Sequence, residues 1–355
     1  MHNIFLESHN IKNLNFGFGQ FNYHLIKGIY NANQDDLNIT VHTPKIQILK
    51  KEFGSSFKYK KYYSLRRYPI FRIKKKYDLW HAMNQNTSIE PYHNTPYLLT
   101  VHNTSHIKDI TDYKNKKNNI KFQEKLNKSD GITYISNYAK ASTHKYFNVP
   151  KVPEFVIYNG NPISKILLTE KHIPKINIQS PYLFTIGEIK SRKNFTSLIP
   201  LILGLKDYKL IIAGKNDTNE AEKIKKLISK HKLSNRVFLV GKISELDKQY
   251  YYKNCSAFVF PSLREGFGLP IVEAMKFEKP IFTSNNTSLP EIGGDLAFYW
   301  DNYDHEHMIE VFENGMHTFI EKQEYYKSKL AKRALSFNWD DAAKAYLKVY
   351  NTLIQ

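Results

Sequence analysis

The sequence has little cysteine, no long apolar run and no N-terminal secretory pattern. Cys255 is its only cysteine, which excludes an intramolecular disulfide framework and is expected to be a core thiol beside an apolar run. The longest apolar-leaning stretch, residues 195–205, is shorter than the roughly 20 residues that a membrane span needs. The first ten residues lack a basic region followed by an apolar one. These absences favour a cytoplasmic globular protein.

Acidic residues are also scarce relative to basic ones. The 52 Lys and Arg against 33 Asp and Glu give a net charge of +19, so the surface attracts anions such as nucleic acid, acidic lipid or phosphorylated substrates. Many lysines lie in Lys/Asn/Ile/Tyr-rich segments such as 45–76 and 114–128, which is also what compositional bias produces. Both interpretations stay open, and the functional one favours an anionic membrane surface that the protein touches without crossing.

The 355 residues exceed what one hydrophobic core usually supports, so two domains are expected. Apolar strand-type runs alternate with helix-type segments of about a dozen residues, which predicts α/β domains with parallel sheets covered by helices on both faces. The expected strands lie at 3–7, 36–44, 77–84, 97–103, 131–135, 156–162, 182–187, 209–214, 236–244, 257–261 and 279–284. Ser136 and Ser288 are expected to cap helices, and residues 163–181 to form a linker.

The stretch 257–275 combines a strand, a glycine loop and a helix start. Pro270 suits the first turn of a helix, which places Glu273 in that turn, and Glu265 precedes the loop glycines. If the loop folds back, both carboxylates face one ligand, and the helix N-terminus favours a phosphate. The alternative is that Glu273 is a surface partner of the helix dipole.

This string, Glu265-GFGLPIV-Glu273, resembles the Glu-x7-Glu signature of retaining glycosyltransferases of the GT4 family. The resemblance implies the GT-B fold, with two Rossmann-like, doubly wound parallel-sheet domains facing across a cleft. It implies an acceptor-side domain over 1–165, against which a terminal helix at 338–355 packs, and a nucleotide-sugar-binding domain over 166–337. In that family the second Glu, here Glu273, holds the ribose hydroxyls, and the first, here Glu265, lies beside the transferred sugar.

Other matches to the family extend the implied donor site. Arg192 and Lys193, in an Arg-Lys-Asn triplet after the strand at 182–187, match the pair that grips the donor diphosphate. Glu188 stands where many members have Arg or Thr, which leaves more of this work to the two cations. The loop of Gly266, Phe267, Gly268 and Leu269 would bring backbone amides to the phosphates, and Gly241 matches the position near the nucleotide base.

On the acceptor side, His102 ends an apolar strand and matches a family histidine that contacts the donor sugar or the acceptor. A pKa near neutrality would let His102 carry a proton, although a lone histidine is otherwise a structural hydrogen bonder. Asn103 follows it where the family has Asp. His81 is likewise expected at a strand tip, where open α/β sheets place ligands, and Gly19 lies in the loop that approaches sugar and acceptor in the family.

The resemblance predicts an enzyme that moves a hexose from a nucleoside-diphosphate sugar to a glycan or lipid-linked saccharide in surface polysaccharide synthesis. The Arg-Lys-Asn triplet and the segment 288–291, Ser-Leu-Pro-Glu, resemble mannosyltransferase-like members and favour mannose. The chain has no Asp-x-Asp motif and no His/Cys cluster, so no cofactor and no metal are expected.

Three alternatives stay open. A UDP-hexose could be the donor. Glu265 and Glu273 could be a glycosidase pair, although this leaves Arg192 and Lys193 without a role. From a different class, the basic chain could bind nucleic acid, but its cations and aromatic residues are scattered rather than gathered on one recognition element.

Overall fold

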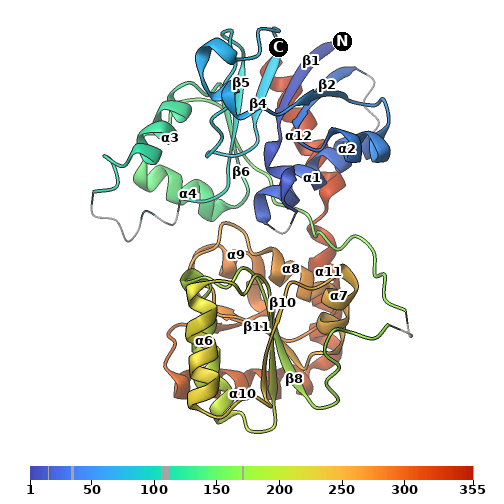
Figure 1. Ribbon diagram of the computed structural model, residues 1–355, viewed down its shortest axis with the longest axis vertical. Helices are drawn as coiled ribbons and strands as arrows, with labels where there is room; N and C mark the ends of the chain where they lie inside the picture. The colour runs from blue at the N-terminus through green and yellow to red at the C-terminus, as the bar shows by residue number, and fades with distance from the viewer. Residues whose placement is uncertain (15, 33–35, 105–106, 108–111, 170–171, 355) are drawn as a thin grey trace. The chain divides into compact units, whose positions relative to one another are not determined.

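The computed structural model describes residues 1–14, 16–32, 36–104, 107, 112–169 and 172–354. The chain forms two compact units (Figure 1): unit 1 is Met1–Pro162 with Asn338–Gln355, and unit 2 is Ile163–Phe337. The boundary expected from the sequence, after residue 165, lies close to this division. Each unit is built around its own sheet.

Unit 1 contains a seven-stranded sheet in the order β3-β2-β1-β4-β5-β6-β7, with every neighbouring pair parallel. Its strands are β1 His2–Glu7, β2 Leu37–Thr43, β3 Lys58–Lys61, β4 Leu79–Ala82, β5 Tyr97–Val101, β6 Gly131–Tyr134 and β7 Glu154–Val156. The central strands β4, β5 and β6 are buried along their whole length, as expected for a parallel sheet covered on both faces.

The helices of unit 1 are α1 Gly17–Asn31, α2 Ile46–Phe53, α3 Lys117–Asn127, α4 Asn137–Tyr146 and α12 Trp339–Ile354. Ser136 caps α4 as predicted, because its hydroxyl accepts a hydrogen bond of 3.0 Å from the amide of Ala139. The terminal helix α12 lies alongside α1 (Figure 1). Their approach requires Gly28, since a Cβ there would lie 2.6 Å from the carbonyl oxygen of Trp339.

Unit 2 contains a six-stranded parallel sheet in the order β10-β9-β8-β11-β12-β13. Its strands are β8 Tyr182–Ile186, β9 Lys209–Ala213, β10 Val237–Gly241, β11 Ala257–Phe260, β12 Ile281–Ser284 and β13 Phe298–Trp300. Its helices are α5 Leu198–Gly204, α6 Asn219–Lys230, α7 Glu245–Asn254, α8 Leu269–Lys276, α9 Leu289–Gly293, α10 His305–Glu321 and α11 Gln323–Ser336. Read in chain order, this is the 3-2-1-4-5-6 arrangement of doubly wound sheets. The predicted fold class is confirmed for both units.

Several sequence-based expectations about elements were wrong. The last strand of unit 1 is β7 at Glu154–Val156 rather than 156–162, and β13 was missed. In the expected linker, described residues on both sides of 170–171 pack on α7: the amide of Leu167 donates to Gln249 Oε1 at 2.7 Å, and that of Ile176 donates to the Tyr251 hydroxyl at 2.9 Å. These long-range contacts have no periodicity, so the sequence pattern could not reveal them.

Candidate functional site

The sheet of unit 2 reverses its strand order between β8 and β11, which are hydrogen-bonded neighbours. In an open parallel sheet the loops at the carboxyl ends of such strands separate and leave room for a ligand. The loop after β8 carries Arg192 and Lys193, and the loop after β11 carries Glu265. A backbone hydrogen bond of 2.8 Å from the Leu263 amide to the Arg192 carbonyl joins the two loops.

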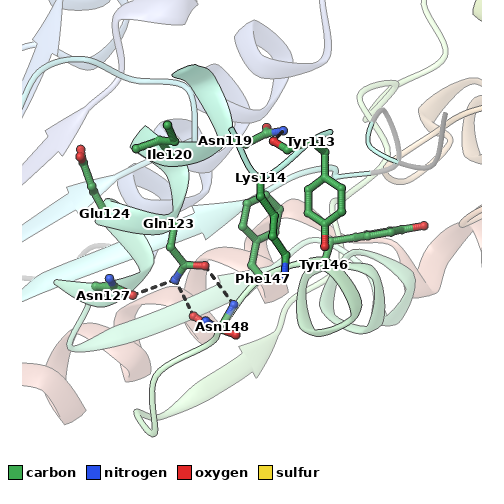
Figure 2. A pocket seen from close by; sticks show the side chains of 10 residues that line it. All are labelled: Tyr113, Lys114, Asn119, Ile120, Gln123, Glu124, Asn127, Tyr146, Phe147 and Asn148. Atoms are coloured by element: carbon green, nitrogen blue, oxygen red, sulfur yellow. Dashed lines mark hydrogen bonds between the residues drawn. The ribbon is translucent and has the colours of Figure 1, made fainter. Parts of the chain in front are cut away.

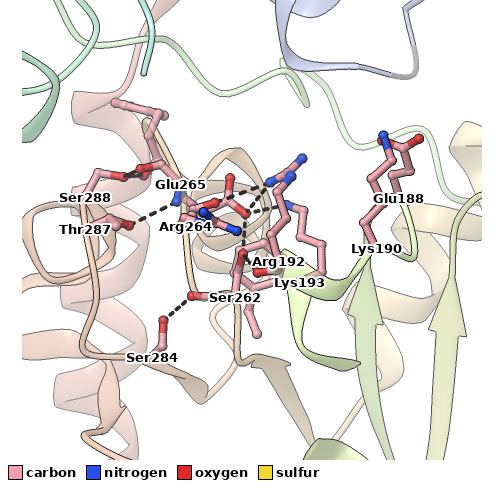
Figure 3. A network of polar contacts seen from close by, with 12 residues as sticks. Glu188, Lys190, Arg192, Lys193, Ser262, Arg264, Glu265, Ser284, Thr287 and Ser288 are labelled. Atoms are coloured by element: carbon pink, nitrogen blue, oxygen red, sulfur yellow. Dashed lines mark hydrogen bonds and ion pairs between the residues drawn. The ribbon is translucent and has the colours of Figure 1, made fainter. Parts of the chain in front are cut away.

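Figure 3 shows the side chains of Arg192 and Lys193 converging on the carboxylate of Glu265. Lys193 Nζ donates a hydrogen bond to Glu265 Oε1, and the Ser262 hydroxyl donates to the same oxygen at 2.7 Å. Arg192 Nη1 lies 3.7 Å from that oxygen. Burial alone would raise the pKa of Glu265, but the charges of Lys193 and Arg192 outweigh it and hold that pKa below its usual value. The carboxylate is therefore ionised at neutral pH.

Hydroxyl groups from the segment after β12 fix the backbone of the Glu265 loop. The Glu265 amide donates to Thr287 Oγ1 at 3.0 Å, and the Ser288 hydroxyl donates to the carbonyls of Glu265 at 3.2 Å and Phe267 at 2.9 Å. The prediction that Ser288 caps α9 was wrong in its chemistry, because Ser288 makes no side-chain cap bond to that helix. A hydroxyl that holds a distant loop has the same sequence signal as a helix cap, so the sequence could not separate them.

Glu273 lies in the second turn of α8, since the helix begins at Leu269 and has no acidic residue in its first turn. The expected first-turn position was therefore wrong, because Glu273 is the fifth residue of the helix and directly follows that turn. Glu273 is 7% exposed; its Oε1 lies 3.2 Å from Lys248 Nζ, and its Oε2 accepts from the Tyr252 hydroxyl at 2.9 Å. Burial opposes the charge of Lys248, yet the carboxylates of Glu273 and Glu245 raise the pKa of this lysine. Glu273 is thus a partly buried carboxylate held by a cation and a phenol.

Sequence reasoning missed Lys248 and Tyr252. They stand four positions apart on α7, so they share one helical face, and that spacing was the available signal. Nothing in the spacing indicates that this face meets Glu273, because the contact depends on how α7 and α8 pack.

The glycine loop between the two carboxylates adopts a conformation that requires glycine. Gly268 has φ +115° and stands immediately before α8, where a Cβ would lie 2.9 Å from Leu289 Cδ2. The Phe267 side chain is buried and packs edge-on against Phe337 at 5.6 Å, so it belongs to the core. Gly266 lies in the turn that precedes the helix, and Leu269 is the first residue of α8.

Gly241 ends β10 with φ +68°, and its carbonyl accepts from the Gly214 amide at 2.8 Å. A Cβ at Gly241 would lie 3.5 Å from the side-chain amide of Asn216. The position is therefore open enough for a side chain, and the constraint on it is the left-handed backbone.

In unit 1, His102 follows β5 and is 5% exposed. Its Nε2 lies 2.9 Å from the Met83 carbonyl, its amide donates to Gln85 Oε1 at 3.1 Å, and the rings of Phe18 and Phe21 meet it edge-on at 4.7 and 4.6 Å. Burial lowers the pKa of His102 to about 4, which corrects the expectation of a pKa near neutrality. Because a carbonyl accepts from Nε2, the neutral ring keeps its proton there and leaves Nδ1 as the accepting nitrogen.

His81 does not stand at a strand tip. It lies inside β4 and is fully buried, with Nδ1 2.8 Å from the Tyr350 hydroxyl and Nε2 2.7 Å from Thr100 Oγ1. Its role is to join the sheet to α12. Gly19 lies in α1, where a Cβ would fall 2.0 Å from the Asn13 carbonyl oxygen, so this glycine permits a close approach of two backbone segments.

A separate pocket of about 270 Å³ lies in unit 1 beside α3 and the end of α4 (Figure 2). Gln123 donates to Asn127 Oδ1 and to the Asn148 carbonyl, both at 2.7 Å, and accepts from the Asn148 amide at 3.0 Å. Gln123 thus forms hydrogen bonds with Asn127 and Asn148 in this pocket. None of the site residues expected from the sequence lines the pocket.

The two doubly wound parallel sheets are those of the GT-B fold class, and the cation-carboxylate cluster lies at the strand reversal of unit 2. Residues 169–333 match the family described as Glycosyl transferases group 1. The match includes all the site residues of unit 2 named above.

Several known proteins are similar to parts of this chain. A serotype-specific mannosyltransferase WbdA of Escherichia coli is 30% identical over 188 residues, which cover 51% of this chain and 23% of that protein. An O-antigen chain mannosyltransferase B of Escherichia coli is 24% identical over 270 residues, which cover 70% of this chain and 66% of that protein. The chain thus spans less than a third of the WbdA proteins that it matches.

Solved structures show the same fold. A glycosyltransferase from Rickettsia africae ESF-5 superposes with a TM-score of 0.74 at 14% identity and covers 100% of this chain and 99% of that one. The sucrose-phosphate synthase of Thermosynechococcus elongatus gives 0.74 at 15% identity, with 99% of each chain covered.

Proposed function

We propose that this chain is a GT4-type retaining glycosyltransferase that moves a hexose from a nucleoside-diphosphate sugar to a glycan or lipid-linked saccharide in surface polysaccharide synthesis. The observation that carries the proposal is the cluster of Arg192, Lys193 and Glu265 at the strand reversal of unit 2. Mannose is the favoured hexose and GDP-mannose the favoured donor, which the names of the mannosyltransferase relatives support.

In the proposed reaction the bond between the anomeric carbon and the diphosphate breaks, and negative charge gathers on the departing nucleoside diphosphate. Arg192 and Lys193 stabilise this charge together with the amides before α8, whose N-terminal end carries partial positive charge. Fixed cations and dipoles in such sites contribute several kcal/mol to catalysis. The acceptor hydroxyl attacks from the same face, and the leaving phosphate takes its proton, so the anomeric configuration is retained.

The carboxylates have different roles in this proposal. Glu265 stays ionised, orients hydroxyls of the sugar and balances positive charge on it. Glu273 accepts the ribose hydroxyls, with Lys248 and Tyr252 holding its carboxylate in place, and Gly241 lies near the base. In unit 1, His102 is a neutral positioning group for sugar or acceptor, and Gly19 lies near the same substrates.

Two further parts of the proposal concern the need for a metal ion and the location of the protein in the cell. The two cations replace a metal ion, so transfer is expected to continue in EDTA. The protein acts in the cytoplasm, and an anionic membrane surface is a partner. Among the described residues, no helix is both long and apolar enough to cross a bilayer.

Binding of GDP, UDP and ADP, measured by calorimetry and thermal shift, tests the donor site. We expect GDP to bind most tightly, with affinity lost in Glu273→Ala, and GDP-mannose to be turned over only when an acceptor is present. Failure of all three nucleotides to bind, together with tight RNA binding at physiological salt, would overturn the proposal in favour of a nucleic-acid-binding protein.

A UDP-hexose donor is the second candidate, favoured by the structural similarity to Alr3699/HepE of Anabaena, solved in complex with UDP and glucose (TM-score 0.69, 14% identity, 99% of each chain covered). Tighter binding of UDP than of GDP would select it. The glycosidase alternative needs a carboxylic acid that stays protonated, whereas the pKa of Glu265 is lowered by its cations. If the protein hydrolyses the donor equally well with and without an acceptor, the glycosidase alternative is favoured.

A further inference from the structure

Residues 58–76 of unit 1, named here the basic-apolar segment, run from β3 to the residue before Tyr77. Lys or Arg fills nine of these positions and no Asp or Glu is present. Among the residues that the structure describes, no carboxylate lies within ion-pair distance of these cations, and several stack on neighbouring tyrosines instead. The guanidinium of Arg66 lies 5.2 Å from the ring centre of Tyr63, and that of Arg67 lies 4.9 Å from Tyr68. The segment is therefore a local excess of positive charge.

Large apolar side chains of the same segment point into solvent. Two short 3-10 helices, Ser64–Arg67 and Pro69–Phe71, contain no buried residue. The most exposed apolar side chains are Leu65 at 53%, Ile70 at 76% and Phe71 at 52%. Single exposed apolar residues are common, but these three lie on two 3-10 helices that contact each other among cations, which marks an interaction surface.

The segment is anchored at both ends. Lys58–Lys61 pairs with β2 at the edge of the sheet, while Ile73 and Tyr77 are 6% and 3% exposed and belong to the core cluster of unit 1. The exposed part between these anchors is thus presented by an ordered scaffold.

We infer that the basic-apolar segment docks unit 1 on a bilayer that contains anionic lipid. Lysine and arginine meet the headgroups, tyrosines lie at the interface, and Leu65, Ile70 and Phe71 enter the acyl boundary. RNA would also attract the cations and stack on the tyrosines, but it offers no apolar environment for exposed leucine and isoleucine, whereas a bilayer does. The inference deepens the membrane part of the proposed function and does not depend on the donor or the transfer chemistry.

Co-sedimentation with vesicles of phosphatidylcholine alone, or with added phosphatidylglycerol, tests the inference. We expect binding only to the anionic vesicles, with a loss when salt is raised. Arg66→Glu with Arg67→Glu should weaken binding about tenfold or more, since each cation near an anionic surface contributes to the attraction. Ile70→Asp with Phe71→Asp should weaken binding similarly and leave less of it at high salt.

Matched controls lie in unit 2. Lys226→Glu with Lys230→Glu makes the same change of charge on exposed positions of α6, and Ile320→Asp with Leu335→Asp removes apolar side chains that are 65% and 74% exposed. Controls that lose binding as strongly as the segment variants would overturn the inference, because binding would then follow total charge or apolarity.

Two further measurements separate the alternatives. Circular dichroism and the GDP affinity of the segment variants are expected to match the parent, so loss of vesicle binding is not loss of folding or of the donor site. Filter binding of single-stranded RNA tests whether the segment binds RNA instead of lipid. If the segment variants lose RNA binding and keep vesicle binding, the lipid assignment is overturned.

Discussion

Lys193, in the loop after β8, donates a hydrogen bond to Glu265, in the loop after β11, and this ion pair joins the two loops at the strand reversal of unit 2. Both side chains are largely buried, with exposures of 8% and 13%. Arg192, at 39%, is the more accessible cation of the cluster. In the proposed function, a diphosphate bound at this place would compete with Glu265 for Lys193, and donor binding would then be coupled to the position of the carboxylate.

Removing one partner of this pair should destabilise unit 2. Lys193→Met leaves Glu265 with its charge buried beside Ser262 and the more distant Arg192, and we expect a loss of about 3 kcal/mol in the free energy of unfolding. The double variant Lys193→Met with Glu265→Gln should lose less than the sum of the two single variants, because neither charge is then left unpaired. Urea unfolding of the four proteins measures this coupling, and additive losses would contradict it.

The same lysine should affect turnover more than donor affinity. If Lys193 stabilises charge on the leaving diphosphate, Lys193→Met lowers kcat by about 100-fold to 1,000-fold. Lys190→Met serves as the control, because Lys190 is more than half exposed and pairs with Glu188 rather than with Glu265. Steady-state kinetics with donor and acceptor would check this, and equal losses in both variants would contradict a specific role for Lys193.

Two substitutions of Glu273 should separate its effect on stability from its effect on nucleotide binding. Glu273→Ala removes the acceptor for the Tyr252 hydroxyl and leaves Lys248 with Glu245, so both stability and nucleotide affinity are expected to fall. Glu273→Gln keeps an oxygen for Tyr252 and should preserve more of the stability while still weakening nucleotide binding. Calorimetry with GDP and thermal unfolding separate the two effects. Parallel losses of affinity and stability across both variants would indicate that Glu273 has only a structural role.

Gly19 and Gly17 both lie on α1, and substitutions at Gly17 serve as the control for substitutions at Gly19. A Cβ at Gly19 would meet the Asn13 carbonyl at 2.0 Å, whereas a Cβ at Gly17 has nothing within 4 Å. We expect Gly19→Ala to lower the free energy of unfolding by about 2 kcal/mol, because the backbone near residue 13 must shift. Gly17→Ala should be neutral or stabilising by up to about 1 kcal/mol through helix propensity. Urea unfolding of both variants checks this, and equal effects would mean that the close approach is not constraining.

Most of the fold could be predicted from the sequence. Apolar residues recur at different intervals in strands and in helices, and the strands are short apolar runs separated by helix-type segments. The sequence placed Arg192 and Lys193 after one strand and Glu265 after another, and only the fold shows that these two strands are neighbours. The sequence could not predict the contact of Glu273 with Lys248, which depends on the packing of α7 against α8. The burial of His81 and His102 was missed for a related reason, because a histidine at the end of an apolar run has the same sequence pattern whether its ring faces solvent or a neighbouring helix.

Those buried histidines make the stability of unit 1 depend on pH. Burial lowers the pKa of His102 to about 4 and that of His81 to about 3, and it also lowers the pKa of His42 although Glu7 opposes this. As pH falls below about 6.5, the unfolded chain binds a proton at His81 and at His102 and the folded chain does not, so each of these two residues lowers the free energy of unfolding by about 1.4 kcal/mol per pH unit. The loss continues until the pH reaches the folded-state pKa of each group. Urea unfolding at pH 7.5, 6.5 and 5.5 should show little change over the first step and a steep fall over the second. His81→Asn should reduce the slope, and a flat profile down to pH 5.5 would contradict the burial of neutral imidazoles.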